Sequence, residues 1–596
     1  MVRKLFAALV ALAALASCTG SQDTAVYCNP LDLDYGWGIF KKDLPLCRTA
    51  ADPVIVMFKD KYYLFSTHDI GGYRVSDDLM HWKNLKFNKE VWNSAYNEGG
   101  TYVAPAVAAD EQFVYFIKIN NDKKARTVDI VRSPDPSKGK WEVCGTIKKV
   151  ADPSLFIDGG RYYVYYGLGN GIRRFELDPS SMSEIPGSEE VILPKVRDVN
   201  ACEGGYEFGR REIFDEIEAP EWKGRYKMTP CQEGSWVTRV GNTCYLQYAT
   251  PGTIAIWYCD AVMTGPSPEG PFTLEPYNPV SLKAGGFIGS AGHGCVFADR
   301  YGNWWEITTM WVGNSNEFER RLGLFPVTFS EEGKMKVHTR LGDYPMVLPQ
   351  RKFDATEGNL AGWMCLSWKK PCTASSSKEG FGPENASDED VRTWWAAEEG
   401  TGANLTMDLG EVMTVNAVQL NFGEQNYTPE NFDDDYTAYR LYASADGSRW
   451  KRVVDRSRNR KTNPHAFHVF DKPLEARYLK LECVHAMNGQ SFAVRDLRVF
   501  GLGNGAPAAA PSDLKAVRDR EDEKYAQLNW TPVEGADGYL VRFGIDPNDL
   551  NLCIQVKDGS TSSLLVHILT RGQKYWWAID SYNESGISEG TTVTEY

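Results

Sequence analysis

Three carboxyl-bearing residues stand at matching places in a pattern that repeats along the first 345 residues of the chain. Asp52 and Asp152 each precede a proline, and Glu233 begins the run Glu-Gly-Ser-Trp. One carboxyl group can protonate a leaving oxygen while another activates a water molecule, which is the chemistry that cleaves a glycosidic bond. A third carboxyl group close by raises the pKa of the acid through like-charge repulsion. These residue types suit hydrolysis of a sugar linkage, provided that the fold brings them together.

The pattern that carries these residues has five copies. In each copy a turn rich in Gly, Asp or Asn precedes an aromatic, alternating segment, which is typical of the second strand of a β-hairpin. These segments are Lys59–Phe65, Asp110–Phe116, Asp158–Tyr165, Val240–Tyr248 and Tyr301–Ile307. Counted from residues 62, 113, 162, 244 and 304, their spacings are 51, 49, 82 and 60 residues. Because a four-stranded blade takes roughly 40–50 residues, we predict an all-β fold that begins with a five-bladed propeller, two of its blades carrying insertions.

A short segment before each aromatic strand is expected to form the inner strand of its blade. Its matching position, nine to eleven residues before the aromatic strand, reads Asp52, Ala104, Asp152, Glu233 and His293. The inner strands of a propeller surround its axis and begin at one mouth of the channel. Asp-Pro pairs also occur at ordinary turns, but two of them in register with a glutamate favour a ring of acids. A ring wide enough to hold a water molecule between acid and base predicts inversion of configuration.

The motifs Ala51-Asp52-Pro53, Ala151-Asp152-Pro153 and Glu233-Gly234-Ser235-Trp236 resemble those of glycoside hydrolase family 43, over about residues 28–350. The resemblance implies a five-bladed β-propeller and an inverting glycosidase that acts on arabinose, xylose or galactose units. It implies that Asp52 is the general base, Asp152 the acid that modulates pKa values and Glu233 the general acid. His293 matches a histidine near the channel centre, where family members often hold calcium or sodium, frequently through water. A hydrogen-bonded structural histidine is the alternative.

Other residues leave more than one interpretation open. The family often has proline after Glu-Gly, where this chain has Ser235, and tyrosine where it has Cys244. Glu218, in the run Glu-Ala-Pro-Glu-Trp, is a rival general acid, although it stands 26 residues before Cys244 and is therefore out of register. Arg320 and Arg321 could donate to sugar hydroxyls or brace the last blade. The aromatic residues that could stack on a sugar, each equally suited to core packing, are Trp236, Trp304, Trp305 and Trp311.

Two further domains are expected after the propeller. Residues 353–500 resemble the coagulation-factor type C, or discoidin, domain, which implies an eight-stranded jelly roll. Such domains often bind carbohydrate, often with a structural calcium near the loop that residues 385–394 would match; packing against the propeller is the alternative role. Residues 501–511 form a Gly/Ala/Pro linker. Residues 512–596 resemble a fibronectin type III sandwich with Trp530 in its core, and we expect a spacer or interaction module there.

The N-terminus has the features of an export signal. Arg3 and Lys4 precede an apolar stretch, and the run Leu-Ala-Ser-Cys that ends at Cys18 resembles a bacterial lipobox. The resemblance implies that residues 1–18 are a lipoprotein signal peptide and that Cys18 is acylated after cleavage. An ordinary signal peptide with a chance cysteine is the alternative. We expect a lipid-anchored protein in the periplasm or on the outer-membrane surface of a bacterium.

Composition narrows the remaining choices. With 65 Lys+Arg against 79 Asp+Glu, the net charge is −14, which argues against a nucleic-acid partner. No apolar run beyond the N-terminus is long enough to cross a bilayer. Among the 13 cysteines no spacing is typical of a zinc site, while Cys28 and Cys47 could pair in an oxidising compartment. The chemistry requires no cofactor, although calcium is a candidate ion at the propeller centre and in the discoidin-like domain.

The sequence therefore predicts a monomeric exo-glycosidase that acts with inversion on a carbohydrate substrate. The expected substrate is a terminal α-L-arabinofuranosyl unit of a polysaccharide or oligosaccharide. Within the same family, β-galactofuranosidase, β-xylosidase and galactosidase activities are the alternatives. A non-catalytic glycan-binding lipoprotein, in which the acids only grip sugar hydroxyls, is a further alternative, but binding alone does not require an acid and a base.

Overall fold

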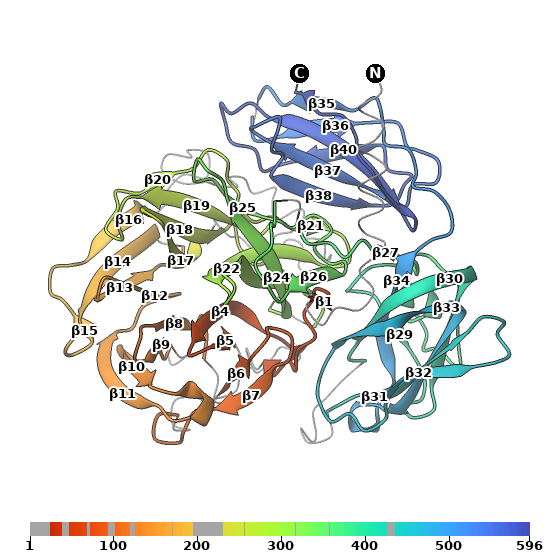
Figure 1. Cartoon of the computed structure of the whole chain (residues 1–596), viewed down its shortest axis with the longest axis horizontal. Coiled ribbons are helices and arrows are strands. Elements are labelled where there is room, and N and C mark those ends of the chain that lie inside the picture. The colour runs from red at the N-terminus through yellow and green to blue at the C-terminus, as the bar shows by residue number, and fades with distance from the viewer. Residues whose placement is uncertain are drawn as a thin grey trace.

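The computed structural model describes the chain from residue 24 to residue 595 with several gaps. The described ranges are 24–38, 47–67, 72–92, 102–119, 125–169, 171–194, 231–254, 257–315, 318–356, 358–425, 435–521 and 523–595. Strands predominate, and the helical elements within these ranges are the single 3-10 turns η2 (Pro136–Lys138), η5 (Pro383–Ala386) and η7 (Met487–Gly489). The strands form a propeller, a middle β-unit and a C-terminal sandwich, which lie against one another (Figure 1). The predicted all-β architecture is confirmed.

The propeller has five antiparallel blades. Blade I contains β4 (Ala51–Phe58), β5 (Lys61–Thr67), β6 (Gly72–Ser76) and β7 (Lys83–Lys86). Blade II contains β8 (Ala106–Ala109), β9 (Val114–Ile117), β10 (Thr127–Ser133) and β11 (Glu142–Lys148). Blade III contains β12 (Ser154–Asp158), β13 (Arg161–Tyr166), β14 (Gly171–Asp178), β15 (Ser183–Glu184) and β16 (Glu190–Pro194). Blade IV contains β17 (Glu233–Val240), β18 (Thr243–Thr250), β19 (Cys259–Gly265) and β20 (Thr273–Leu274). Blade V contains β22 (Gly289–Ala298), β23 (Trp304–Trp311), β24 (Arg320–Phe329) and β25 (Met335–Val337).

Local sequence explains why each inner strand turns back on an aromatic partner. Lys59 and Asp60 both have positive φ, of 49° and 59°, so β4 and β5 are joined by a tight turn whose twist matches that of the strands. The aromatic strand β5 is buried on both faces, and Tyr63 and Leu64, which point to opposite sides, are both at most 1% exposed. Apolar clusters between neighbouring blades carry most of the stabilisation, since burial of apolar surface drives folding.

The five inner strands close a ring around the propeller axis. Strand β4 lies beside β8, β8 beside β12, β12 beside β17, β17 beside β22, and β22 beside β4 again. Their labels surround the middle of the propeller in Figure 1. Strand β1 (Thr24–Tyr27) comes from the N-terminal end of the described chain and pairs with β26 (Met346–Pro349), which follows blade V. This pairing ties the two ends of the propeller together, and the nearby strands β2 (Trp37–Gly38) and β3 (Cys47–Arg48) form a small ribbon.

The middle β-unit is an eight-stranded arrangement around one core. Its two longest strands are β30 (Asn404–Phe422) and β33 (His465–His485), which pair along most of their length with two register shifts. The remaining strands are β27 (Met364–Cys365), β28 (Cys372–Ala374), β29 (Trp395–Ala396), β31 (Ala438–Ser444), β32 (Lys451–Arg456) and β34 (Ala493–Leu502). Their buried faces enclose a separate apolar cluster that includes the fully buried Trp395. This unit therefore has a core of its own.

The C-terminal sandwich consists of two sheets. One sheet contains β35 (Lys515–Arg518), β36 (Ala526–Asn529) and β39 (Ser563–Val566); the other contains β37 (Gly538–Gly544), β38 (Leu552–Lys557), β40 (Trp576–Asn583), β41 (Gly586–Ser588) and β42 (Val593–Thr594). Trp530 is 5% exposed and belongs to the shared core, as predicted. Strand β21 (Ala284–Gly285) of the propeller extends the second sheet by pairing with β38. The fibronectin type III resemblance of this sandwich stays a prediction.

The structure adds detail to the linker and to two of the cysteines. Within the linker 501–511, Ala508 is buried and the Ser581 hydroxyl donates to its carbonyl oxygen at 3.0 Å. A disulfide between Cys28 and Cys47 is absent: Cys28 keeps a reduced, buried thiol whose Sγ lies 3.3 Å from the carbonyl oxygen of Asp343. The predicted signal peptide with Cys18 lies outside the described residues. Within the described ranges we find no helix with the length and hydropathy needed to cross a membrane.

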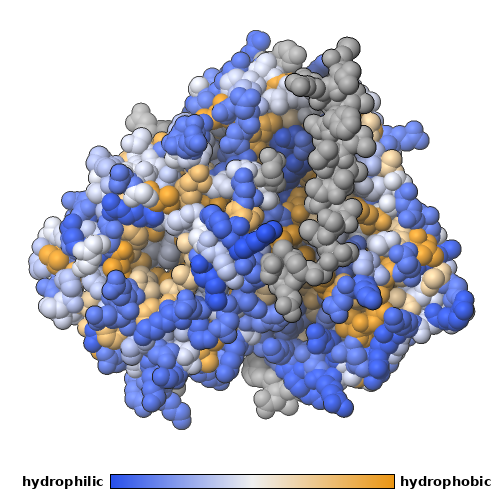
Figure 2. Space-filling model, in the orientation of Figure 1, coloured by the Kyte–Doolittle hydropathy of each residue, from blue (hydrophilic) through white to orange (hydrophobic). Residues whose placement is uncertain are grey.

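The surface is predominantly polar. In the face shown in Figure 2, hydrophilic residues surround scattered hydrophobic patches. The exposed large hydrophobic side chains include Met57, Val143 and Leu168, which belong to different blades or their connections. Single exposed apolar residues of this kind are normal for a folded protein and do not mark a binding surface.

Candidate active site

The five inner strands share one unusual backbone feature at their entry. In each strand, or two residues before it, the matching position has a left-handed conformation: Asp52 (φ 49°), Ala104 (φ 40°), Asp152 (φ 46°), Gly234 (φ 58°) and His293 (φ 54°). In β22, Ser290 (φ 79°) is left-handed as well. Such angles cost a non-glycine residue on the order of 1–3 kcal/mol and tend to occur at functional sites. The sequence alignment placed Glu233 at this position, and the structure corrects it by one residue, because Gly234 is the equivalent of Asp52.

The His293 ring explains why blade IV has a glycine at this position. A Cβ atom on Gly234 would lie 2.5 Å from Cγ of His293, which is closer than any real contact allows. The residue before the glycine therefore carries the carboxyl group in this blade. Glu233 is half-buried at the first position of β17. The glutamate side chain is longer than that of aspartate, so its carboxyl group can join the other acids at the channel mouth from that neighbouring position.

Asp52 is held by donors from three other strands. Its Oδ2 accepts a hydrogen bond from the Thr67 hydroxyl at 2.5 Å, and its Oδ1 lies 3.3 Å from Nη1 of Arg320. Nδ1 of His293 lies 3.3 Å from the same Oδ1. The side chain is 10% exposed. Two cationic groups and a hydroxyl therefore surround its carboxylate oxygens, an arrangement that suits a group that accepts a proton from water.

The carboxyl group of Glu233 accepts hydrogen bonds from two uncharged donors. Its Oε1 accepts a hydrogen bond from the Tyr258 hydroxyl at 2.8 Å, and its Oε2 lies 3.3 Å from Sγ of Cys231. Tyr258 is 1% exposed. Neither residue was predicted from the sequence, because Tyr258 lies between two strands and follows no motif. The two donors fix the direction of the carboxyl group without supplying a positive charge, which suits a group that must carry a proton.

The pKa of Asp152 depends on burial and on the charges of the other residues at the channel mouth. Burial raises its pKa to about 7; the charge of His293 acts in the opposite direction, while the carboxylates of Glu233 and Asp52 raise the pKa further, and Arg320 lowers it. The same groups are therefore close enough to one another to interact through the mouth of the channel. The structure thus brings Asp52, Asp152, Glu233 and His293 together, with Arg320 beside them.

A further buried acid, Asp260, holds the backbone of the histidine. The backbone N–H groups of His293 and Gly294 donate to the two carboxylate oxygens of Asp260, both at 2.8 Å. Burial raises the pKa of Asp260 to about 6. Burial lowers the pKa of His293, but the surrounding carboxylates, led by Asp52, outweigh it and raise the pKa above its ordinary value. His293 therefore favours its charged form, which offsets the negative charge of the surrounding acids.

The residues around His293 do not by themselves form a metal site. Nδ1 of His293 faces Asp52, and no cluster of three or more His, Cys, Asp or Glu side chains suited to a metal ion occurs among the described residues. Calcium at the propeller centre, held through water, and calcium in the middle β-unit remain predictions of the family resemblance.

Replacing Asp152 with asparagine should stabilise the protein at high pH. The pKa of Asp152 is raised from 3.8 to about 7 in the folded protein, so ionisation opposes folding. This cost is absent below about pH 4, grows up to about pH 7 and is constant above it. We expect Asp152→Asn to raise Tm by a few degrees at pH 8 and to have no stabilising effect at pH 4, as measured by calorimetry. An equal change in Tm at both pH values would contradict this charge assignment.

The tryptophans expected to stack on a sugar are mostly used inside the propeller. Trp304 starts β23 at the end of the strand away from the mouth and packs edge-on against Phe329, so the structure argues against a sugar contact there. Trp305 is fully buried, and Trp236 donates its indole N–H to the Val296 carbonyl oxygen at 2.9 Å. Trp311 ends β23 on the mouth side and lines a cavity of about 290 Å³. Among these four, Trp311 is placed nearest to the mouth.

The remaining candidates from the sequence are Glu218, the rival general acid, and the two arginines Arg320 and Arg321. Glu218 lies outside the described residues, together with the insertion that carries it. Of the two arginines, Arg320 contacts Asp52, whereas Arg321 points into the interface with the middle β-unit and its Nε donates to Nε2 of His465 at 2.7 Å. Arg321 therefore braces the last blade against the middle β-unit, whereas a contact of Arg320 with a sugar stays a prediction.

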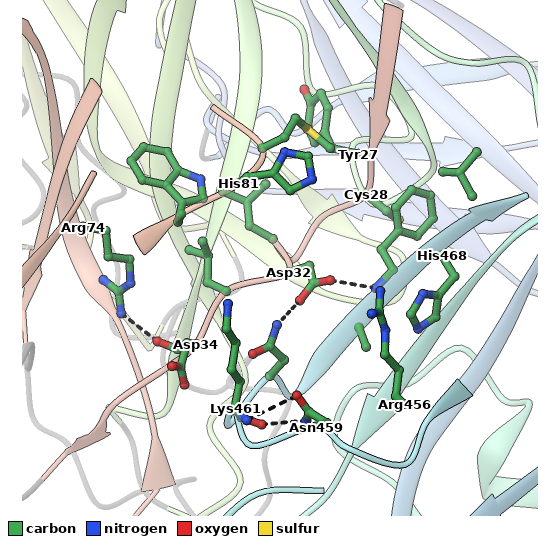
Figure 3. A pocket seen from close by; sticks show the side chains of 18 of the residues that line it. Tyr27, Cys28, Asp32, Asp34, Arg74, His81, Arg456, Asn459, Lys461 and His468 are labelled. Atoms are coloured by element: carbon green, nitrogen blue, oxygen red, sulfur yellow. Dashed lines mark hydrogen bonds between the residues drawn. The ribbon is translucent and has the colours of Figure 1, made fainter. Parts of the chain in front are cut away.

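A cavity of about 730 Å³ lies between blade I and the middle β-unit, away from the acid ring (Figure 3). Its acids are already engaged: Asp32 accepts hydrogen bonds from the Asn463 amide at 2.5 Å and from the Phe467 backbone N–H at 3.1 Å. Asp34 accepts from the backbone N–H of Thr462 at 3.0 Å. Both carboxylates serve to join the two units. We therefore assign the candidate hydrolytic chemistry to the ring and not to this cavity.

A five-bladed propeller with three carboxyl groups, a histidine and an arginine at one mouth of its channel defines a propeller glycosidase. Comparison with protein families gives the same class: residues 45–335 match the model for glycosyl hydrolases family 43, and residues 371–497 match the F5/8 type C domain. The protein is a glycoside hydrolase whose propeller belongs to family 43, and its middle β-unit is an F5/8 type C domain. The predicted family and enzyme class are confirmed.

Similar solved structures include several glycoside hydrolases. One described as a glycoside hydrolase is 17% identical, with 76% of this chain and 97% of that chain covered and a TM-score of 0.43. An endo-1,4-beta-xylanase from Bacteroides thetaiotaomicron is 20% identical (52% and 98% covered, TM-score 0.38). An alpha-L-arabinanase from Cellvibrio cellulosa is 16% identical (49% and 95% covered, TM-score 0.36). No curated protein matches the chain. These structural likenesses are too distant to indicate a substrate.

Proposed function

We propose that this glycoside hydrolase is an inverting exo-enzyme that releases terminal α-L-arabinofuranosyl units. The observation that carries inversion is the order of the inner strands. Asp52 is on β4 and Glu233 is on β17, and these strands are not neighbours, because β22 with His293 lies between them. A histidine between the two carboxyl groups keeps them apart, and a gap that admits a water molecule between acid and base predicts inversion.

In the proposed reaction Asp52 acts as the general base. Thr67 and Arg320 fix its carboxylate, so that the free electron pairs are directed toward a water molecule on one side of the sugar. As the water attacks the anomeric carbon, its proton passes to Asp52. Holding the base and the water in one geometry removes much of the entropic barrier to the attack.

Glu233 acts as the general acid on the other side of the sugar. Its proton passes to the glycosidic oxygen as the bond to the anomeric carbon breaks, so that the leaving alcohol departs neutral. Tyr258 and Cys231 keep the carboxyl group oriented. Asp152 would serve as the acid that modulates pKa values in the site, as the family resemblance implies. After the reaction Asp52 holds a proton and Glu233 is ionised, and exchange with solvent restores both.

The sugar itself is inferred from the family resemblance. The family acts on arabinose, xylose or galactose units, so β-xylosidase, galactosidase and β-galactofuranosidase activities are the competing specificities. An exo-acting enzyme binds one terminal sugar at the ring. We also propose that the protein is a monomer anchored to the bacterial cell envelope through an acylated Cys18, because the run ending at that residue resembles a lipobox.

Hydrolysis of a panel of aryl glycosides tests this proposal. We expect release of the aryl group from α-L-arabinofuranoside and, in proton NMR of fresh product, the anomer opposite to that of the substrate. Retention of configuration would contradict a gap between Asp52 and Glu233 that admits a water molecule. Preference for a xyloside or galactoside would leave inversion in place and change the sugar. Binding without hydrolysis of any member would instead support a non-catalytic glycan-binding protein.

A further inference from the structure

A cluster of buried ions joins the propeller to the F5/8 type C domain close to the acid ring. The propeller contributes Arg48, Glu319 and Arg321, and the type C domain contributes Glu424, Arg495 and the neutral His465. All six side chains are nearly or fully buried. Buried charges on this scale are costly unless every partner is in place, so the cluster fixes the relative position of the two units.

His465 acts in this cluster as an acceptor. The guanidinium of Arg321 donates from Nε to Nε2 of His465 at 2.7 Å, and Nδ1 of His465 lies 2.7 Å from Oδ1 of Asn421. Burial and the surrounding arginines hold the pKa of His465 well below its ordinary value, so the ring is neutral. A neutral ring that donates from Nδ1 to Asn421 leaves Nε2 free to accept from Arg321.

Glu319, which directly precedes β24, is a second contact between the propeller and the type C domain. Its Oε1 accepts from Nη2 of Arg495 at 2.9 Å and lies 3.3 Å from Nη2 of Arg321. Arg495 also donates to Glu424 at 3.1 Å, and Glu424 accepts from Arg48. The type C domain therefore contacts both residues that flank Arg320 along the chain.

Arg320 lies between Glu319 and Arg321, and its side chain points to the opposite side of β24, toward Asp52. Its backbone N–H donates to the Thr49 hydroxyl at 3.1 Å, and its carbonyl oxygen accepts from Nη1 of Arg321, also at 3.1 Å. Its guanidinium meets Asp52 through one contact of 3.3 Å, and its buried Nε has no acceptor among the described residues. The guanidinium also lies over the Phe318 ring, 5.5 Å from its centroid, and both contacts depend on where the backbone of Arg320 is held.

We propose that the F5/8 type C domain positions Arg320 against Asp52, through His465 and Arg321, and is thereby part of the catalytic apparatus. His465 is a positioning residue in this scheme, since it contacts Arg321 and neither Asp52 nor the substrate. The inference rests on the proposed role of Asp52 as the general base. It gives the domain a function in the reaction that does not require it to bind a glycan.

A double-mutant cycle tests the coupling in the full-length protein. We expect His465→Ala to lower kcat about tenfold or more with little change in KM, because small displacements of catalytic groups have large kinetic costs. His465→Gln should recover most of the loss, since its amide oxygen can accept from Arg321. In an Arg320→Ala background, His465→Ala should lower kcat no further. A merely structural role would give independent, multiplicative losses in both backgrounds, and that result would overturn the proposal.

The matched control is a buried ion pair in the same domain. Glu389 accepts from Nε of Arg498 at 2.7 Å and from Nη2 at 2.8 Å, and neither residue contacts the Arg320 strand in the described part of the chain. We expect Glu389→Gln to lower Tm while kcat stays unchanged. An equal loss of kcat in Glu389→Gln would show that any damage to the domain suffices, which contradicts a specific path through His465.

Crystal structures keep this inference separate from the proposed function. In His465→Ala, or in His465→Asn if the alanine variant does not fold, we expect the guanidinium of Arg320 to move away from Asp52. An unchanged contact would overturn the inference even if the enzyme is an active glycosidase. A displaced guanidinium in a protein with no activity on any glycoside would instead support the positioning and count against the proposed function.

Discussion

Replacing Asp52 with asparagine is expected to lower kcat by about 10³-fold, which is the typical contribution of a well-placed general base. The amide keeps the size of the side chain and can still meet Thr67 and Arg320, but it cannot take a proton from water. Because the base acts on water and not on the leaving group, the loss should be similar for good and poor leaving groups. Steady-state kinetics on a series of aryl glycosides measures this directly.

Two controls make the result for Asp52 specific. Tm and circular dichroism of Asp52→Asn should match those of a folded protein, because its backbone bond to the Thr309 hydroxyl, at 2.9 Å, does not involve the side chain. KM should change little compared with kcat. If the variant keeps more than about a tenth of the activity, Asp52 is not the general base, since loss of a base costs at least about 10²-fold.

Replacing Glu233 with glutamine should give a loss that depends on the leaving group. A poor leaving group needs protonation as it departs, so we expect kcat to fall by about 10³-fold for an unactivated alcohol. A dinitrophenolate leaves without help, so the loss there should be less than about tenfold. The slope of log kcat against the pKa of the leaving phenol should accordingly become steep in Glu233→Gln and stay shallow in Asp52→Asn.

Glu218 supplies the natural comparison for this experiment. If Glu233 is the general acid, Glu218→Gln should retain the shallow slope of the unaltered enzyme. A steep slope in Glu218→Gln together with a shallow slope in Glu233→Gln would transfer the role to Glu218. The hydrogen bonds from Tyr258 and Cys231 to Glu233 would then be structural only.

The repeat in the sequence was enough to predict the propeller and the approximate place of its acids. Turn residues and alternating aromatic strands depend on local geometry, so each hairpin can be recognised without knowledge of its neighbours. Asp52 and Asp152 lie where that pattern places them. The sequence pattern placed Glu233 at the position equivalent to Asp52, whereas Gly234 holds that position in the structure. The reason is a clash between a Cβ on Gly234 and the His293 ring, which involves two strands that are far apart in the sequence.

Contacts between blades and between domains could not be predicted in this way. Trp304 and Trp311 are both tryptophans of β23, yet one packs at the far end of the strand and the other lies on the mouth side. Likewise Arg320 and Arg321 are adjacent, and only the alternation of side chains along β24 sends one to Asp52 and the other to His465. A motif describes residue types in order, whereas side-chain direction depends on where a strand begins and on what packs against each face.

The sequence by itself determined the class of this protein: a five-bladed propeller with a ring of acids, followed by a type C domain. The propeller could be predicted because hairpin turns, hydrophobic alternation and motif spacing are local properties of the chain, whereas the type C domain was inferred from the resemblance of its motifs to that family. Only the tertiary structure decided which groups hold each acid, that Tyr258 orients Glu233, and that the type C domain contacts the strand of Arg320. These facts depend on hydrogen bonds and buried charges between residues up to several hundred positions apart, whose energies exist only once the chain has folded.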